Sequence, residues 1–315
     1  MPIETFHTQI ARNKRNSFLL IGLFMLFFVG LGLLIGMVWG GGDWWFGWIV
    51  AIIAGGVAFF LTLASFYGGG SALLAMSKAK EIRKSDDPQL FNVVEELSLA
   101  AGIPMPRVYS IDDTAMNAFA TGRNPRHAAV AVTKGLREKL TRDELQGVMA
   151  HELSHVRHYD ILYATLMAVL VGTLVMLCDV FLRSLWFGGR YRSRRSSSAR
   201  RQGGGGAAQA ILLVVALVLA IIAPILERII QMALSRQREY LADSGSVELT
   251  RHPDGLASAL AKISGDQEVL EVANRATAPL YIVHPIKKFE ARASSIFSTH
   301  PATKDRVKRL VALTH

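Results

Sequence analysis

Residues 151–155, HELSH, combine two histidines and a glutamate at a spacing that can bind a metal ion. Four residues along an α-helix turn through about 400°, so His151 and His155 project from one face, one turn apart. Two imidazoles in this arrangement can hold one Zn²⁺, and the neighbouring Glu152 can take a proton from a water molecule that the zinc activates. The motif therefore predicts a metal-assisted hydrolase.

The sequence just before the motif carries the start signals of a helix. Thr141 and Glu144 form a T-x-x-E capping box, and Leu140 and Leu145 can pack against each other beside it. The expected apolar side of this helix is formed by Val148, Met149 and Leu153. We therefore expect a capped and buried helix, as an active site needs.

A catalytic zinc site needs a third protein ligand. His158 lies two turns after His151, about 10 Å along the axis, which is too far for one ion to bind both with ideal geometry. The extended form of the motif needs a glycine at position 158 and a histidine at position 161, where this chain has His158 and Ile161. The third ligand must therefore come from another segment.

The stretch SRQREYLADSG, residues 235–245, offers Glu239 and Asp243 on one helix face. Glu239 can complete a His–His–Glu site, and Asp243 can accept a hydrogen bond from the free nitrogen of a ligand histidine. The spacing alone does not separate this hypothesis from an ordinary acidic helix surface.

The composition indicates a membrane protein. The 315 residues are 51% hydrophobic, carry a formal charge of +10 and have a mean hydropathy of +0.29. Residues 17–39 and 46–67 are uncharged apolar runs, each longer than the roughly 20 residues that cross a bilayer. The first run is too long for a signal peptide and is followed by no cleavage site, so we predict a transmembrane hairpin at 17–67.

Two further apolar runs, 161–182 and 207–226, predict a second hydrophobic hairpin at 161–226. The segment between them, 183–206, is rich in Arg, Ser and Gly, so we expect a flexible loop near anionic lipid headgroups and no nucleic acid. Cys178, the sole cysteine, lies in an apolar run, which excludes a disulfide framework.

The polar parts of the chain are expected to form one catalytic domain, interrupted by the second hairpin. Its first part is 68–160 and its second part is 227–315, while 1–16 is a polar N-terminal extension. RVYSIDD and AAVAVTKGL are typical of strands, with 117–126 as their polar connection. The predicted fold is mainly α-helical with a small β-sheet.

Positive charges suggest the orientation in the membrane. Arg12, Lys14 and Arg15 precede the first run, and Lys78, Lys80, Arg83 and Lys84 follow the second. The positive-inside bias thus puts the N-terminus and the catalytic domain in the cytoplasm. The seven arginines of 183–201 would break the same rule if the second hairpin spans the membrane, so whether it spans stays open.

Four stretches, in this order, resemble the HtpX family of bacterial membrane zinc metalloproteases, relatives of the CAAX prenyl proteases. They are NAFATG at 117–122, HELSHVRHYD at 151–160, SRQREYLADSGS at 235–246 and STHPATKDRVKRL at 298–310. The resemblance extends over nearly the whole chain and implies a zincin-like domain in the inner membrane, multi-pass, with its catalytic side in the cytoplasm.

The resemblance also implies roles for single residues. His151, His155 and Glu239 would bind one zinc ion, with Glu152 as general base and Asp243 as the partner of a ligand. Asn117, Ala118, Phe119 and Ala120 would form an edge strand that pairs with the substrate backbone. His300 would come near the site and stabilise the transition state. The polar extension and the arginine-rich loop depart from shorter family members, and we expect neither to touch the chemistry.

The expected activity is a zinc endopeptidase that cleaves misfolded or damaged membrane proteins, or other unfolded polypeptides, in membrane quality control and the stress response. A prenyl-protein-type membrane protease is an alternative. A non-enzymatic membrane adaptor with structural zinc is another, but a closed structural site needs a fourth ligand, most often cysteine.

Overall fold

The computed structural model describes residues 6–174, 236–266 and 301–313, together with residues 218, 268, 270 and 280–282. The chain divides into two compact units. Unit 1 consists of Met1–Ser17, Ser65–Val169 and Ile230–His315, and unit 2 of Phe18–Ala64 and Leu170–Ile229. The predicted loop 183–206, most of the second hydrophobic hairpin and His300 lie outside the described residues.

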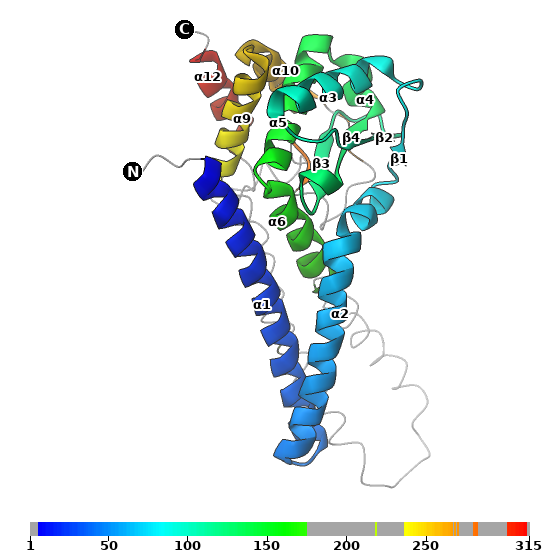
Figure 1. The fold of residues 1–315 in the computed structure, drawn as a ribbon, viewed down its shortest axis with the longest axis vertical. Helices are drawn as coiled ribbons and strands as arrows, with labels where there is room; N and C mark the ends of the chain where they lie inside the picture. The colour runs from blue at the N-terminus through cyan, green and yellow to red at the C-terminus, as the bar shows by residue number, and fades with distance from the viewer. Residues whose placement is uncertain are drawn as a thin grey trace, which may run out of the picture. The chain divides into compact units, whose positions relative to one another are not determined.

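Two long helices, α1 (Phe6–Trp39) and α2 (Trp44–Met76), begin the chain (Figure 1). Their stretches Thr8–Met37 and Trp44–Met76, of 30 and 33 residues, are long and apolar enough to cross a membrane. Both helices are longer than the predicted apolar runs, because α1 begins in the polar sequence of residues 6–16 and α2 continues through residues 68–76, and both extensions belong to unit 1. The two apolar helices predicted at the N-terminus are therefore present.

Small residues let these two helices approach closely within unit 2. A Cβ atom added to Gly36 would lie 2.8 Å from the Cα atom of Gly47, a separation that real side chains do not show. Between the helices, Gly41 and Gly42 have φ angles of +63° and +94°, which glycine adopts without strain. Glycine thus permits both the turn and the packing, as is common between transmembrane helices.

The described residues of unit 1 include a mixed sheet of four strands. The strands are β1 (Lys80–Glu81), β2 (Arg107–Ile111), β3 (Ala118–Gly122) and β4 (Ala128–Thr133). Their order is β1-β2-β4-β3, with β2 and β4 parallel and the other pairs antiparallel. Among the described residues β3 is therefore an edge strand, as the resemblance implied for residues 118–120, and the prediction of a polar connection over 117–126 is wrong for residues 118–122. The residues of β3 are buried because this segment pairs with β4 inside the unit.

Helices cover the sheet and connect its strands. They are α3 (Pro88–Ala101), α4 (Lys134–Lys139), α5 (Arg142–Arg157), α6 (Asp160–Leu166), α9 (Arg236–Thr250), α10 (Pro253–Gly265) and α12 (Thr303–Val311), with a 3-10 turn η1 (Pro125–His127) and a π-helical turn η2 (Met167–Val171). α5, which carries HELSH, contacts α3, α9, α10 and β3. It is the central helix of unit 1.

The predicted start of α5 is confirmed. The Thr141 side chain accepts a hydrogen bond from the Glu144 backbone, and the Glu144 side chain accepts one from the Thr141 backbone, which completes the capping box. Leu140 and Leu145 are both buried beside it. Eleven of the 16 residues of α5 are buried, so the motif lies inside the protein rather than on its surface.

Candidate metal centre

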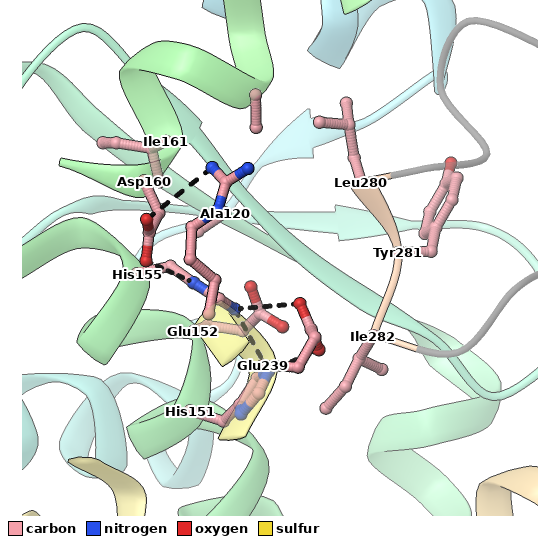
Figure 2. A pocket seen from close by; sticks show the side chains of 12 residues that line it. Ala120, His151, Glu152, His155, Asp160, Ile161, Glu239, Leu280, Tyr281 and Ile282 are labelled. Carbon is pink, nitrogen blue, oxygen red and sulfur yellow. Dashed lines mark hydrogen bonds and ion pairs between the residues drawn. The ribbon is translucent and has the colours of Figure 1, made fainter. Parts of the chain in front are cut away.

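The two motif histidines and Glu239 converge on one point, as Figure 2 shows. The Nε2 atoms of His151 and His155 are 3.2 Å apart. The Glu239 carboxylate, from α9, lies 3.6 Å from Nε2 of His151 and 3.7 Å from Nε2 of His155. Ligands of a tetrahedral zinc ion are separated by about 3.3 Å, given Zn–N bonds of about 2.0–2.1 Å. The donor set and its spacing therefore fit a zinc ion.

The Nδ1 atom of each histidine lies within hydrogen-bonding distance of a carboxylate. Nδ1 of His151 lies 3.0 Å from Oδ1 of Asp243, and Nδ1 of His155 lies 3.0 Å from Oδ2 of Asp160. An N–H at Nδ1 that donates to a carboxylate leaves Nε2 with its lone pair toward the metal. The contact of Asp243 agrees with the role predicted for it. The sequence does not predict this role for Asp160, because a separation of five residues from His155 does not put the two side chains on one helix face.

A left-handed residue explains how Asp160 reaches its histidine. Tyr159 has a φ angle of +62° and separates the end of α5 from the start of α6. This turn redirects the chain, so that Asp160 returns toward the last turn of α5. The signal in the sequence is only an aspartate just after the motif helix.

Arg306, from α12, is the second site residue that sequence reasoning missed. It is 1% exposed and donates two hydrogen bonds to Asp243, from Nε at 2.9 Å and from Nη2 at 2.6 Å. Its Nη1 atom lies 3.4 Å from Glu239. A bidentate arginine fixes a carboxylate in orientation as well as in charge. Arg306 thus holds the partner of one predicted ligand and contacts another ligand directly.

The electrostatics of the pocket favour a positive charge between the histidines. Burial and the nearby Arg306 lower the pKa of His151, but hydrogen bonds to Asp243 and Glu239 outweigh them and raise its pKa to about 9. A metal ion supplies the same positive charge at this place.

Glu152 lines the same pocket and is 3% exposed. Burial raises the pKa of its carboxyl above the ordinary value, although His151, His155 and a hydrogen bond from the Ala120 backbone oppose the change. A raised pKa brings a glutamate closer to the proton affinity that a general base needs near neutral pH.

The open side of β3 also reaches this pocket through Ala120. Successive residues of an edge strand turn their backbone groups alternately toward the sheet and away from it. The carbonyl of Ala118 faces away and accepts a hydrogen bond of 3.1 Å from the backbone of Ile282. Residues 280–282 therefore already occupy part of the open edge of β3, and a substrate strand that pairs with β3 would lie beside them.

The other residues predicted for the edge strand have structural contacts. The Asn117 backbone bonds to Thr133, and its side-chain oxygen accepts from the N–H of Ala118, which anchors the start of β3. Phe119 is buried and packs edge-on against Tyr281, with ring centroids 5.2 Å apart. These two residues shape the strand, and their role toward a substrate stays a prediction, as do the ligand and base roles above.

The chain is similar to several known proteins. Residues 84–314 match the family described as "Peptidase family M48". A "Protease HtpX homolog" of Lactobacillus acidophilus is 44% identical over 306 residues, which cover 96% of this chain and 98% of that protein. The homolog from Listeria monocytogenes serotype 4b is 45% identical over 304 residues, covering 96% and 98%. The crystal structure of S. mikatae Ste24p shows 17% identity and a TM-score of 0.46, covering 89% of this chain and 62% of that chain.

Proposed function

Because the chain belongs to peptidase family M48, as a membrane metalloprotease of the HtpX type, we propose that it is a zinc-dependent endopeptidase of the bacterial inner membrane. The observation that carries the proposal is the meeting of His151, His155 and Glu239 around one point, with Glu152 in the same pocket. Two histidine nitrogens and one carboxylate oxygen are a set of three protein ligands typical of catalytic zinc sites, and these residues would hold the ion.

The residues of the pocket divide the chemistry between them. When bound, the ion supplies Lewis acidity, which polarises a peptide carbonyl and makes water a better nucleophile at neutral pH. Glu152 takes the proton from the attacking water and gives it to the leaving amine. Asp243 and Asp160 keep the imidazoles in the tautomer and orientation that present Nε2.

We propose that the substrates are misfolded or damaged membrane proteins, cleaved at extended cytoplasmic segments. A strand added to β3 gains affinity mainly from backbone hydrogen bonds, so extended chains of varied sequence can dock there. A site tethered to the membrane favours substrates held at the same surface, through effective concentration. The positive charges that precede the apolar run of α1 and follow α2 support a cytoplasmic catalytic side. The second hydrophobic hairpin and the lipid contact of 183–206 remain part of this proposal.

The test is a cleavage assay of the full chain, purified in detergent and loaded with zinc, on casein and on a destabilised membrane protein. Glu152→Gln keeps the side-chain shape but loses the base, so zinc stays bound while cleavage falls about 100-fold or more. Glu248→Gln is the matched control, because Glu248 is an exposed residue of α9 that pairs with Arg157 at 3.1 Å, outside the pocket. Full cleavage by Glu152→Gln would refute the mechanism. A wild type that binds zinc and cleaves nothing would favour the non-enzymatic adaptor.

A further inference from the structure

The first turns of α1 carry buried polar side chains ahead of the apolar span. Gln9, Asn13 and Ser17 are 2%, 1% and 2% exposed. Their spacing of four residues puts them on one face of the helix. All three belong to the part of α1 that lies in unit 1. A buried polar face at this place needs partners inside that unit, because burying unpaired polar groups costs free energy.

The partners lie in the turn of residues 158–160, at the end of the motif helix. Nδ2 of Asn13 donates to Oδ1 of Asp160 at 2.5 Å and to the carbonyl of His158 at 3.0 Å. Nε2 of Gln9 lies 3.5 Å from Oδ2 of Asp160. The ammonium group of Lys14 lies 4.3 Å from the ring centroid of Tyr159. One helical segment thus contacts every residue of this turn, about 145 positions away in the sequence.

These contacts lead directly to a predicted metal ligand. Asp160 has two carboxylate oxygens: Oδ1 accepts the hydrogen bond from Asn13 and lies 3.8 Å from Nη1 of Arg238, and Oδ2 is 3.0 Å from Nδ1 of His155. Because the first oxygen is fixed, the second has one orientation toward the imidazole. Asp243, the partner of His151, is held in the same manner by Arg306. Each histidine therefore contacts a carboxylate. Asn13, in the N-terminal part of the chain, donates a hydrogen bond to Asp160, and Arg306, in the C-terminal part, donates to Asp243.

We propose that the polar N-terminal segment is part of the metal site, with Asn13 as a positioning residue that acts through Asp160 on His155. The inference rests on the proposed metal-binding function. It corrects the expectation that the N-terminal extension does not touch the chemistry, because that extension bonds the residue that orients a ligand. The sequence carried no sign of it, since Asn13 and Asp160 are 147 residues apart.

Loss of Asn13 should misorient His155 rather than remove it. Changing a residue that orients a ligand costs about 10- to 100-fold in metal affinity, and Asn13 is one hydrogen bond further away, so we expect about 10-fold for Asn13→Leu. The cobalt(II)-loaded variant should show a changed visible absorption spectrum, because that spectrum reports ligand geometry. We expect a lower kcat with little change in KM, since no substrate contact is altered.

The experiment measures zinc affinity by chelator competition, the cobalt spectrum, and kcat and KM, all on the full chain in detergent. Ser17→Ala is the control, because Ser17 is buried on the same helix face but donates only to the carbonyl of Asn13 in its own helix. Ser17→Ala should behave as the wild type. An Asn13→Leu variant with wild-type affinity, spectrum and kcat would overturn the inference. A wild type without zinc or activity would instead refute the proposed function.

A double variant keeps the inference testable if Asn13→Leu folds poorly. Asn13→Asp alone puts two carboxylates against each other and should weaken zinc binding further. Combined with Asp160→Asn, it restores a donor and an acceptor at the pair, and the amide oxygen at position 160 can still accept from His155. The double variant should therefore bind zinc more tightly than Asn13→Asp alone, and a coupling of this kind identifies a direct pair. No recovery in the double variant would overturn the inference.

Discussion

Glu144 joins the start of the motif helix to α10 through hydrogen bonds from both elements. Its Oε2 atom accepts from the Thr141 N–H at 2.8 Å and from Nζ of Lys262 at 2.8 Å, and its Oε1 atom accepts from Oγ of Ser258 at 2.5 Å. Burial raises the pKa of this carboxyl, but the hydrogen bonds from Lys262, Ser258 and Thr141 outweigh it and lower the pKa from 4.5 to about 2. The ionised carboxylate therefore stabilises the folded state.

The size of this stabilisation follows from the pKa change. Each tenfold change in proton affinity corresponds to about 1.4 kcal/mol, so the lowered pKa is equivalent to roughly 3 kcal/mol at neutral pH. The Lys262 side chain is 45% exposed, and solvent screens its share of the attraction. We expect Glu144→Gln to lower the free energy of opening at the start of α5 by about 1.5–2 kcal/mol.

Hydrogen exchange of the segment 136–150 at pH 7 is the direct assay, because it reports local opening. A loss of about 1.5–2 kcal/mol speeds exchange of its amides roughly 10- to 30-fold. Glu96→Gln is the matched control: the ion pair of Glu96 with Arg142 lies near the same helix start but is about half exposed on both sides. Its removal should change exchange by a factor of two or less, as for an ordinary surface pair.

The pH dependence checks the cause. A carboxyl with a lowered folded pKa stabilises the protein fully above its ordinary pKa, and this contribution is lost as the pH falls toward 2. The difference in thermal stability between wild type and Glu144→Gln should be largest above about pH 5 and should fall to less than half by pH 3. A difference that stays constant from pH 7 to pH 3, or wild-type exchange in Glu144→Gln at pH 7, would refute the reasoning.

Three further predictions concern the metal ligands, the packing of α9 on α5 and the edge strand. Glu239→Ala should abolish stoichiometric zinc binding. Asp243→Asn should weaken zinc binding roughly 10- to 100-fold, and excess zinc should restore full occupancy. The measurement is the metal content of each variant after gel filtration. In Gly245→Ala the added Cβ overlaps the Ser154 hydroxyl and lies 3.0 Å from the Cβ atom of Ser154, so the hydroxyl must rotate and α9 and α5 must separate slightly. This costs roughly 1–3 kcal/mol in a thermal melt, and Ser154→Gly in the same chain should recover most of it. Ala120→Pro should retain zinc but lose at least about 10-fold in hydrolysis of an unfolded substrate, because proline removes the N–H at the pocket edge.

The features predictable from the sequence are local and periodic. The capping box at Thr141, the histidines one turn apart and the two apolar helices each follow from spacing within a single element. Glu239 was open on spacing alone, and only resemblance to a family singled it out. β3 was harder, since a short strand that pairs at one edge leaves little periodic signal.

The supporting residues could not be predicted because their partners are distant in the sequence. Arg306 and Asp243 are 63 residues apart, and Asn13 and Asp160 are 147 apart, so no periodic pattern connects either pair. An arginine within a basic C-terminal helix is typical of a solvated surface, and an asparagine ahead of an apolar span is typical of an interface with water. Both side chains are only 1% exposed, so neither lies at such a surface. Their burial is a property of the fold, and the sequence does not show it.

The charged residues around the pocket also affect metal binding through their total charge. Among the residues that the structure describes, the buried carboxylates there are those of Glu152, Asp160, Glu239 and Asp243, and the buried guanidinium groups are those of Arg238 and Arg306. Four negative and two positive groups leave a formal charge of −2 when the histidines are neutral. Buried charge is costly unless it is balanced, and one divalent cation balances this set. The site therefore favours a doubly charged metal ion through its total charge as well as through its ligands. Arg306→Leu would make that total more negative while freeing Asp243 from its holder, so the geometry of the site should suffer even where the attraction for a cation increases.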